Sequence, residues 1–184
     1  MEKCIFLESF IYCPKCGGEF RDNNVKSKAC VKCGFIYYFN PSSAVVAIIK
    51  NPKGEILVAT RDREPAKGTF DLPGGFVDSF ESGEQSVCRE VKEECGVDVI
   101  STKYLFSLPN LYVYSGFEVH TLDMFFECEV ADFEHIKAED DVAELQFIPI
   151  SEIDISKFGL QSVRRGLERY IKELQGDDCA NISC

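Results

Sequence analysis

The alternation of apolar and polar residues predicts a series of strands separated by short turns. One apolar strand is expected from Ala44 to Lys50 and a second from Glu55 to Arg61. Asn51-Pro-Lys-Gly54 between them has typical turn composition, so we predict a β-hairpin here. Further strand-like stretches lie at about 97–107, 119–130 and 145–149.

Two segments instead show the period of an amphipathic helix. The first is expected from about residue 83 to 95, because Ser82 and Gln85 have capping-box spacing and Gly96 is a typical helix stop. The second runs from Leu160 to Leu174 and carries apolar residues on one side, as a helix that covers a sheet does. Mixed strands with one central and one C-terminal helix predict an α/β or α+β sandwich.

The first of these helices carries a group of carboxylates on one face. Glu90, Glu93 and Glu94 are spaced i, i+3 and i+4, so their charges repel one another. A hard divalent cation with oxygen ligands, Mg²⁺ or Mn²⁺, would relieve this repulsion. The alternative is a solvated acidic helix face, because Glu is a common helix former.

The spacing of the residues around these carboxylates favours the metal site. Gly75 is followed after five residues by Glu81, and seven residues later by Arg89-Glu-Val-Lys-Glu-Glu-Cys-Gly-Val97. This pattern resembles the signature box of the Nudix hydrolases at every specified position. The resemblance implies a three-layer α/β/α sandwich with a mixed sheet over residues 42 to about 175.

The resemblance also implies roles for residues around the box. Glu81 would support the metal site through contacts to residues that bind the metal, without binding it directly. Arg89 could bind phosphate, or could hold the loop by pairing with Glu81. Backbone at Gly74 and Gly75 could add a ligand, since glycine permits close approach.

Four of the ten cysteines have a separate pattern near the N-terminus. Two Cys-x-x-Cys pairs with this separation favour tetrahedral zinc coordination, and four thiolates leave no open position, so the site would be structural. A redox pair or incidental cysteines are the alternatives. The candidate ligands are Cys13, Cys16, Cys30 and Cys33.

A zinc ribbon directly before the Nudix pattern is similar to the architecture of the NADH pyrophosphatases. We therefore predict an N-terminal arm and zinc ribbon over residues 1–40, a Nudix hydrolase domain over 41–176, and a flexible tail over 177–184. Homodimerisation is implied by this resemblance alone.

The chemistry implied is Mg²⁺- or Mn²⁺-dependent cleavage of the diphosphate linkage in a nucleoside diphosphate derivative, with NADH, NAD or ADP-ribose as candidates. In this family a loop after the box often provides the base, and Asp141 is the first candidate, with Glu144 second; a solvated acidic loop is the alternative. Tyr112 and Tyr114 could stack on a base or be core residues. The stretch containing them departs from the NADH pyrophosphatase pattern, and the chain has no tryptophan.

Composition narrows the function classes. The formal charge of −11 argues against a nucleic-acid backbone as the main ligand. The sequence has no apolar run of membrane-span length and no signal-peptide pattern, so we predict a cytoplasmic protein. Two non-enzymatic alternatives remain: a nucleotide sensor without catalysis, and a ribbon that binds nucleic acid or protein through Lys15, Lys26, Lys28 and Lys32.

Overall fold

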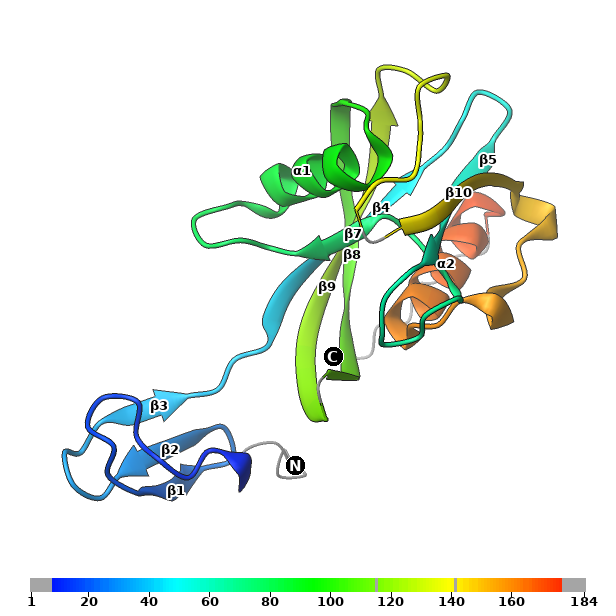
Figure 1. Ribbon diagram of the computed structural model, residues 1–184. Coiled ribbons are helices and arrows are strands. Elements are labelled where there is room, and N and C mark those ends of the chain that lie inside the picture. Colours follow the sequence, from blue (N-terminus) through cyan, green and yellow to red (C-terminus); the bar gives the residue numbers. More distant parts are fainter. Residues whose placement is uncertain (1–7, 115, 141, 177–184) are drawn as a thin grey trace. The chain divides into compact units, whose positions relative to one another are not determined.

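The computed structural model describes residues 8–114, 116–140 and 142–176, with the side chains of Tyr112 and Tyr114 outside this description (Figure 1). The chain divides into two compact units, residues 1–41 with 112–120 and residues 42–111 with 121–184. The tail predicted over 177–184 lies outside the described residues. Among the described residues, no helix is long and apolar enough to cross a membrane.

The first unit contains a small antiparallel sheet. Its strands are β1 (Phe20–Asn24), β2 (Ser27–Cys30) and β3 (Ile36–Tyr38), in the order β1-β2-β3. The two Cys-x-x-Cys pairs flank these strands, because Cys13 and Cys16 precede β1 whereas Cys30 ends β2 and Cys33 follows it.

The remaining strands form two sheets, and most of their residues belong to the second unit. The larger has the order β7-β4-β9-β8, with β4 (Ser42–Ile49) parallel to β9 (Phe117–Val130) and antiparallel to β7 (Gly74–Phe76). Its outer strand is β8 (Val99–Tyr114). The smaller sheet has the order β10-β5-β6, formed by β10 (Val142–Pro149), β5 (Glu55–Arg61) and β6 (Phe70–Asp71).

The predicted hairpin between the first two apolar strands is therefore wrong in its pairing. The turn at Asn51–Gly54 is present, with the Gly54 N–H donating to the Asn51 carbonyl over 2.9 Å. However, β4 and β5 belong to different sheets, and the ladder between them is limited to a bridge between Lys50 and Ile56. The turn composition fixes where the chain reverses, whereas the partner of each strand depends on the whole core.

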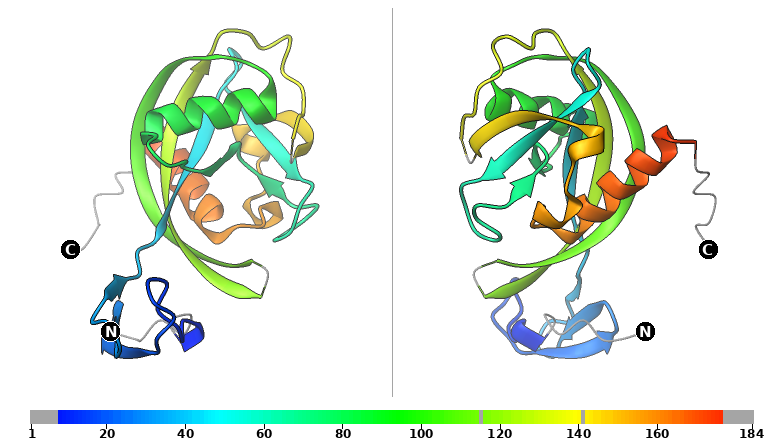
Figure 2. Two further views of the ribbon diagram at one scale, coloured as in Figure 1. Left: turned by 60° about the vertical axis from the view of Figure 1, so that its left-hand side comes forward. Right: turned by 90° about the vertical axis from the view of Figure 1, so that its right-hand side faces the viewer.

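Two helices cover opposite faces of the larger sheet (Figure 2). Alternate residues of β4 face opposite sides, because side chains alternate across a strand. Val45, Ala47 and Ile49 pack with α1 (Gly83–Cys95), whereas Val46 and Ile48 pack with α2 (Gln161–Leu174). Two 3₁₀ helices, Ile150–Glu152 and Ile155–Lys157, precede α2. The α/β/α sandwich with a mixed sheet is confirmed.

Both ends of α1 agree with the sequence prediction. Ser82 is the N-cap, and its side chain and that of Gln85 form the reciprocal capping-box hydrogen bonds. Gly96 ends the helix with φ of 71°, a left-handed conformation that glycine adopts without steric cost. The helix that carries the carboxylates is thus defined by local chemistry at each end.

A buried ion pair fixes the strand that leads into the Gly74–Gly75 loop. Arg61, at the end of β5, donates through Nη1 to Oδ2 of Asp71 over 2.5 Å, and Asp71 is 7% exposed. The Asp71 carboxylate also accepts the Leu72 N–H over 2.9 Å. Burial raises the pKa of Asp71, and Arg61 counteracts this rise.

We expect Arg61→Met to lower the free energy of unfolding by about 3 kcal/mol at neutral pH, because it leaves a buried carboxylate unpaired. Without Arg61 the folded-state pKa of Asp71 rises further above its unfolded value. The loss should therefore be largest at pH 7–8 and shrink as the pH falls through the raised pKa, where Asp71 binds a proton in the folded state. Urea titrations at several pH values measure this.

The matched control is Lys67→Met, which removes an exposed cation from the next loop and should change the free energy of unfolding little. Arg61→Met combined with Asp71→Leu should recover much of the stability. An equal loss at pH 5 and pH 8 would contradict the ion-pair interpretation.

Candidate active site

The glycine loop lies directly against the carboxylates of α1. Gly74 has φ of 154°, and a Cβ there would lie 2.1 Å from the carbonyl oxygen of Val45, so only glycine fits. The Gly74 N–H donates to Oε2 of Glu94 over 2.9 Å. A Cβ on Gly75 would lie 2.5 Å from Oε1 of Glu90. The loop thus leaves room for two carboxylates at its surface.

Arg89 connects this loop to the helix. Its Nε and Nη2 donate to the two carboxylate oxygens of Glu81 over 2.9 and 3.0 Å. Its Nη1 donates to Glu90 over 2.8 Å and to Glu93 over 2.9 Å. A further bond joins Nη2 to the Phe76 carbonyl over 3.0 Å. All three guanidinium nitrogens are engaged, which favours the loop-holding role over phosphate binding.

The electrostatics of this cluster follow from these contacts. Hydrogen bonds from Arg89 lower the pKa of Glu81. The Glu90 side chain is only 13% exposed, and this burial raises its pKa. The hydrogen bond and charge of Arg89 oppose that rise. The charged form of Glu90 is therefore incompletely compensated by its protein surroundings.

These carboxylates suit a hard divalent cation. Oxygen donors from Glu90 and Glu94 lie beside backbone that glycine keeps open, and an ion would compensate the buried charge of Glu90. Glu93 is farther out, with a side chain 48% exposed. Glu90 and Glu93 share Nη1 of Arg89 as a donor, whereas Glu94 accepts the Gly74 N–H, so two different protein donors hold the three carboxylates.

The acidic loop after β9 is attached to the C-terminal end of α1. The Glu139 N–H donates to the Glu94 carbonyl over 3.0 Å, and the Lys137 N–H donates to the Cys95 carbonyl over 3.2 Å. Asp141 itself lies outside the described residues. Glu144 is exposed on β10, opposite Thr60 of β5. The second half of the loop predicted to supply a base thus lies beside α1.

The loop that follows β5 meets this acidic loop at one end of the small sheet. Val142, at the start of β10, pairs with Arg61 at the end of β5. Arg63, just beyond β5, forms an ion pair with Asp140 at 3.6 Å. Sequence reasoning did not single out Arg63, because only the tertiary pairing of β5 with β10 brings the two loops together.

The aromatic candidates for base stacking occupy the end of β8. Tyr112 and Tyr114 belong to this strand, but their side chains are outside the described part of the structure. Their stacking role stays a prediction.

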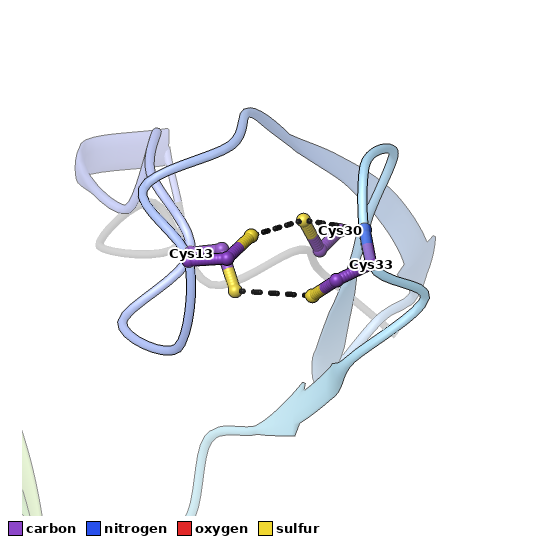
Figure 3. Close-up of side chains that lie close together, drawn as sticks. Cys13, Cys30 and Cys33 are labelled. Atoms are coloured by element: carbon purple, nitrogen blue, oxygen red, sulfur yellow. Dashed lines mark hydrogen bonds between the residues drawn. The ribbon is translucent and has the colours of Figure 1, made fainter.

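The four N-terminal cysteines form a compact sulfur cluster (Figure 3). Their Sγ atoms all lie within 4.8 Å of one another. The Cys13–Cys33 and Cys16–Cys30 sulfur distances are 3.9 and 3.6 Å. Tetrahedral zinc with Zn–S bonds of about 2.3 Å requires sulfur separations of about 3.8 Å. The backbone N–H of Cys33 lowers the pKa of Cys30 to about 6, whereas the neighbouring thiols, Cys33 foremost, raise the pKa of Cys16 to about 11 against the backbone hydrogen bond from Gly18. Zinc fits this cluster.

Comparison with known proteins extends these observations. The family model described as "NUDIX domain" matches residues 40–170. The chain is 29% identical over 171 residues to the ADP-ribose pyrophosphatase of Methanocaldococcus jannaschii, covering 92% of this chain and 97% of that protein. It is 26% identical to the NAD-capped RNA hydrolase NudC of Stutzerimonas stutzeri, covering 89% of this chain and 55% of that protein. The chain thus spans about half the length of that relative.

A solved structure shows the same fold. The NUDIX hydrolase from Nitrosomonas europaea superposes with a TM-score of 0.70 at 23% identity, covering 90% of this chain and 92% of that chain. The family match over most of the chain, the helix with its glycine loop, and this shared fold agree with one another. The chain belongs to the Nudix hydrolase family.

Proposed function

We propose that the protein hydrolyses the diphosphate linkage of a nucleoside diphosphate derivative, with ADP-ribose as the first candidate and NADH or NAD as the next. The observation that carries this proposal is the contact between the Gly74–Gly75 loop and the carboxylates of Glu90 and Glu94. The relative named ADP-ribose pyrophosphatase, which aligns over nearly its whole length, supports the choice of substrate.

The residues of the site have distinct proposed roles. Glu90 and Glu94 would hold Mg²⁺ or Mn²⁺, with Glu93 at the exposed side and backbone at Gly74–Gly75 nearby. When bound, such an ion supplies positive charge for the diphosphate oxygens and promotes ionisation of water. Arg89 binds Glu81, Glu90 and Glu93 and so keeps the carboxylates in place.

The acidic loop would supply the general base. Glu139 fixes the loop to the carbonyl of Glu94, and Asp141 follows two residues later. We expect Asp141→Asn to lower kcat by about 10²- to 10⁴-fold with little change in stability, because a positioned base contributes about that much. Steady-state kinetics with ADP-ribose, together with thermal unfolding, measure both quantities.

Two comparisons sharpen this experiment. Glu144→Gln changes the second candidate, and Glu134→Gln makes the same chemical change at an exposed site earlier in the loop. A large loss of kcat in Glu144→Gln but not in Asp141→Asn would transfer the role to Glu144. Unchanged turnover in both would remove the base from this loop.

Product analysis tests the proposed reaction itself. With Mg²⁺, ADP-ribose and water should give AMP and ribose 5-phosphate, and NADH should give AMP and reduced nicotinamide mononucleotide. NAD, FAD, NAD-capped RNA and diadenosine polyphosphates complete the panel. Binding without any Mg²⁺-dependent product would contradict the proposal and favour the nucleotide sensor.

The N-terminal region has a separate proposed role. We infer that residues 1–40 form an arm and a zinc ribbon in which Zn²⁺ stabilises the fold, since the four sulfurs fit tetrahedral coordination. The Nudix hydrolase domain over 41–176, the homodimer, the cytoplasmic location and the absence of nucleic-acid binding stay predictions.

A further inference from the structure

The proposed reaction needs positive charge that the box itself does not offer to a substrate. The cluster holds Glu81, Glu90, Glu93 and Glu94, and each nitrogen of Arg89 already donates to a carboxylate or a carbonyl. The chain as a whole carries a formal charge of −11. A diphosphate is itself anionic, so a cation outside the box would favour its binding.

The structure places Arg63 where the acidic loop after β9 ends and β10 begins. Arg61 pairs with Val142, so residues 62–63 leave the small sheet where residue 140 approaches it. The Arg63–Asp140 ion pair joins these two segments at 3.6 Å. The adjacent Glu139 N–H binds the carbonyl of Glu94, whose side chain binds the Gly74 N–H. A short chain of contacts therefore links Arg63 to the proposed diphosphate site.

The Arg63–Asp140 pair has the properties of an exchangeable contact. Its side chains are 65% and 57% exposed, and ion pairs at such exposure contribute little to stability. A phosphate group offers a guanidinium two parallel charge-assisted hydrogen bonds, which are stronger than an exposed contact at 3.6 Å to a carboxylate. Bound substrate could thus displace Asp140 at small cost.

We propose that Arg63 is a substrate-binding residue that exchanges Asp140 for a phosphate of the bound diphosphate. This inference rests on the proposed function. It assigns Arg63 the phosphate-binding role that the sequence offered to Arg89. Asp140 then competes with the substrate phosphate for Arg63.

The proposal predicts opposite effects at the two ends of the ion pair. Arg63→Gln should weaken binding of α,β-methylene-ADP, a non-hydrolysable diphosphate, by about ten-fold, because a charged hydrogen bond is lost. Arg63→Lys should fall between that variant and the wild type, because lysine keeps the charge without the planar fork. Asp140→Asn should instead strengthen binding by about two- to five-fold, because the competing carboxylate is neutralised.

The same loop provides a matched pair of controls. Lys67 and Asp62 form an exposed ion pair at 3.0 Å, with side chains 57% and 55% exposed. Lys67→Gln and Asp62→Asn change the charge as Arg63→Gln and Asp140→Asn do, but they leave the Arg63–Asp140 contact and the acidic loop after β9 unaltered. Both should bind the diphosphate within about two-fold of the wild type, since surface charges are screened at 0.15 M salt.

Isothermal titration with α,β-methylene-ADP in Mg²⁺ measures these affinities independently of turnover. Weaker binding by Arg63→Gln and tighter binding by Asp140→Asn, with unchanged controls, is the expected result. Equal effects in the Arg63 and Lys67 variants, or weaker binding by Asp140→Asn, would overturn the inference. Wild-type binding without hydrolysis of any substrate would refute the proposed function while leaving the role of Arg63 measurable, and no binding by the wild type would refute both.

Discussion

Replacing Glu94 by Gln is expected to lower kcat/KM for ADP-ribose by about 10³-fold, because a metal ion contributes several kcal/mol of charge stabilisation and each 1.4 kcal/mol is about a factor of ten. Glutamine keeps an oxygen that can accept the Gly74 N–H, so the 2.9 Å contact and the fold should survive. The charge that attracts a divalent cation is lost. Both kcat/KM, measured by steady-state kinetics, and the affinity for Mn²⁺ should therefore fall, while the melting temperature changes little.

Glu84→Gln is the matched control, because it makes the same change in the first turn of α1. Glu84 is exposed, and we expect its variant to keep nearly full activity. Glu90→Gln should resemble Glu94→Gln in activity. Normal turnover in either box variant would remove that carboxylate from the metal site.

Removal of zinc is expected to unfold the ribbon without unfolding the sandwich. The ribbon is a small unit in which two of the buried apolar residues, Cys13 and Cys30, belong to the sulfur cluster. Domains below about 40 residues rarely fold without a metal, a disulfide or a partner. Structural zinc supplies about 10–16 kcal/mol in such units, so its loss exceeds any contribution of this small core.

Cys30→Ser tests this expectation together with chelation of the wild type. Elemental analysis should find one zinc per wild-type chain and none in the variant, and limited proteolysis should then cleave within residues 8–41. Cys88→Ser is the control, because it alters a thiol outside the cluster. Wild-type protein with no zinc and an intact ribbon would contradict the account.

Features encoded by neighbouring residues could be predicted from the sequence. The ends of α1 depend on Ser82, Gln85 and Gly96, which act within one turn of the helix. The amphipathic pattern of α2 likewise fixes the face that packs on the sheet, and Val163, Leu167 and Tyr170 are buried there. Local hydrogen bonding and hydrophobic period decide these elements.

Features that depend on distant segments could not be predicted. The turn at 51–54 looked like that of a hairpin, but competition among all strands assigned β4 and β5 to different sheets. Arg89 binds three carboxylates and the Phe76 carbonyl, and this requires the loop before α1 to fold back over that helix. The Arg63–Asp140 contact likewise depends on the pairing of β5 with β10.

The most direct test of the account is the anomalous scattering of Mn²⁺ in crystals grown with a non-hydrolysable ADP-ribose analogue. We expect a manganese peak at coordination distance, about 2.1 Å, from carboxylate oxygens of Glu90 and Glu94, with the diphosphate bound to the same ion. A bound analogue with no metal at these residues, and with both carboxylates turned to solvent, would contradict it.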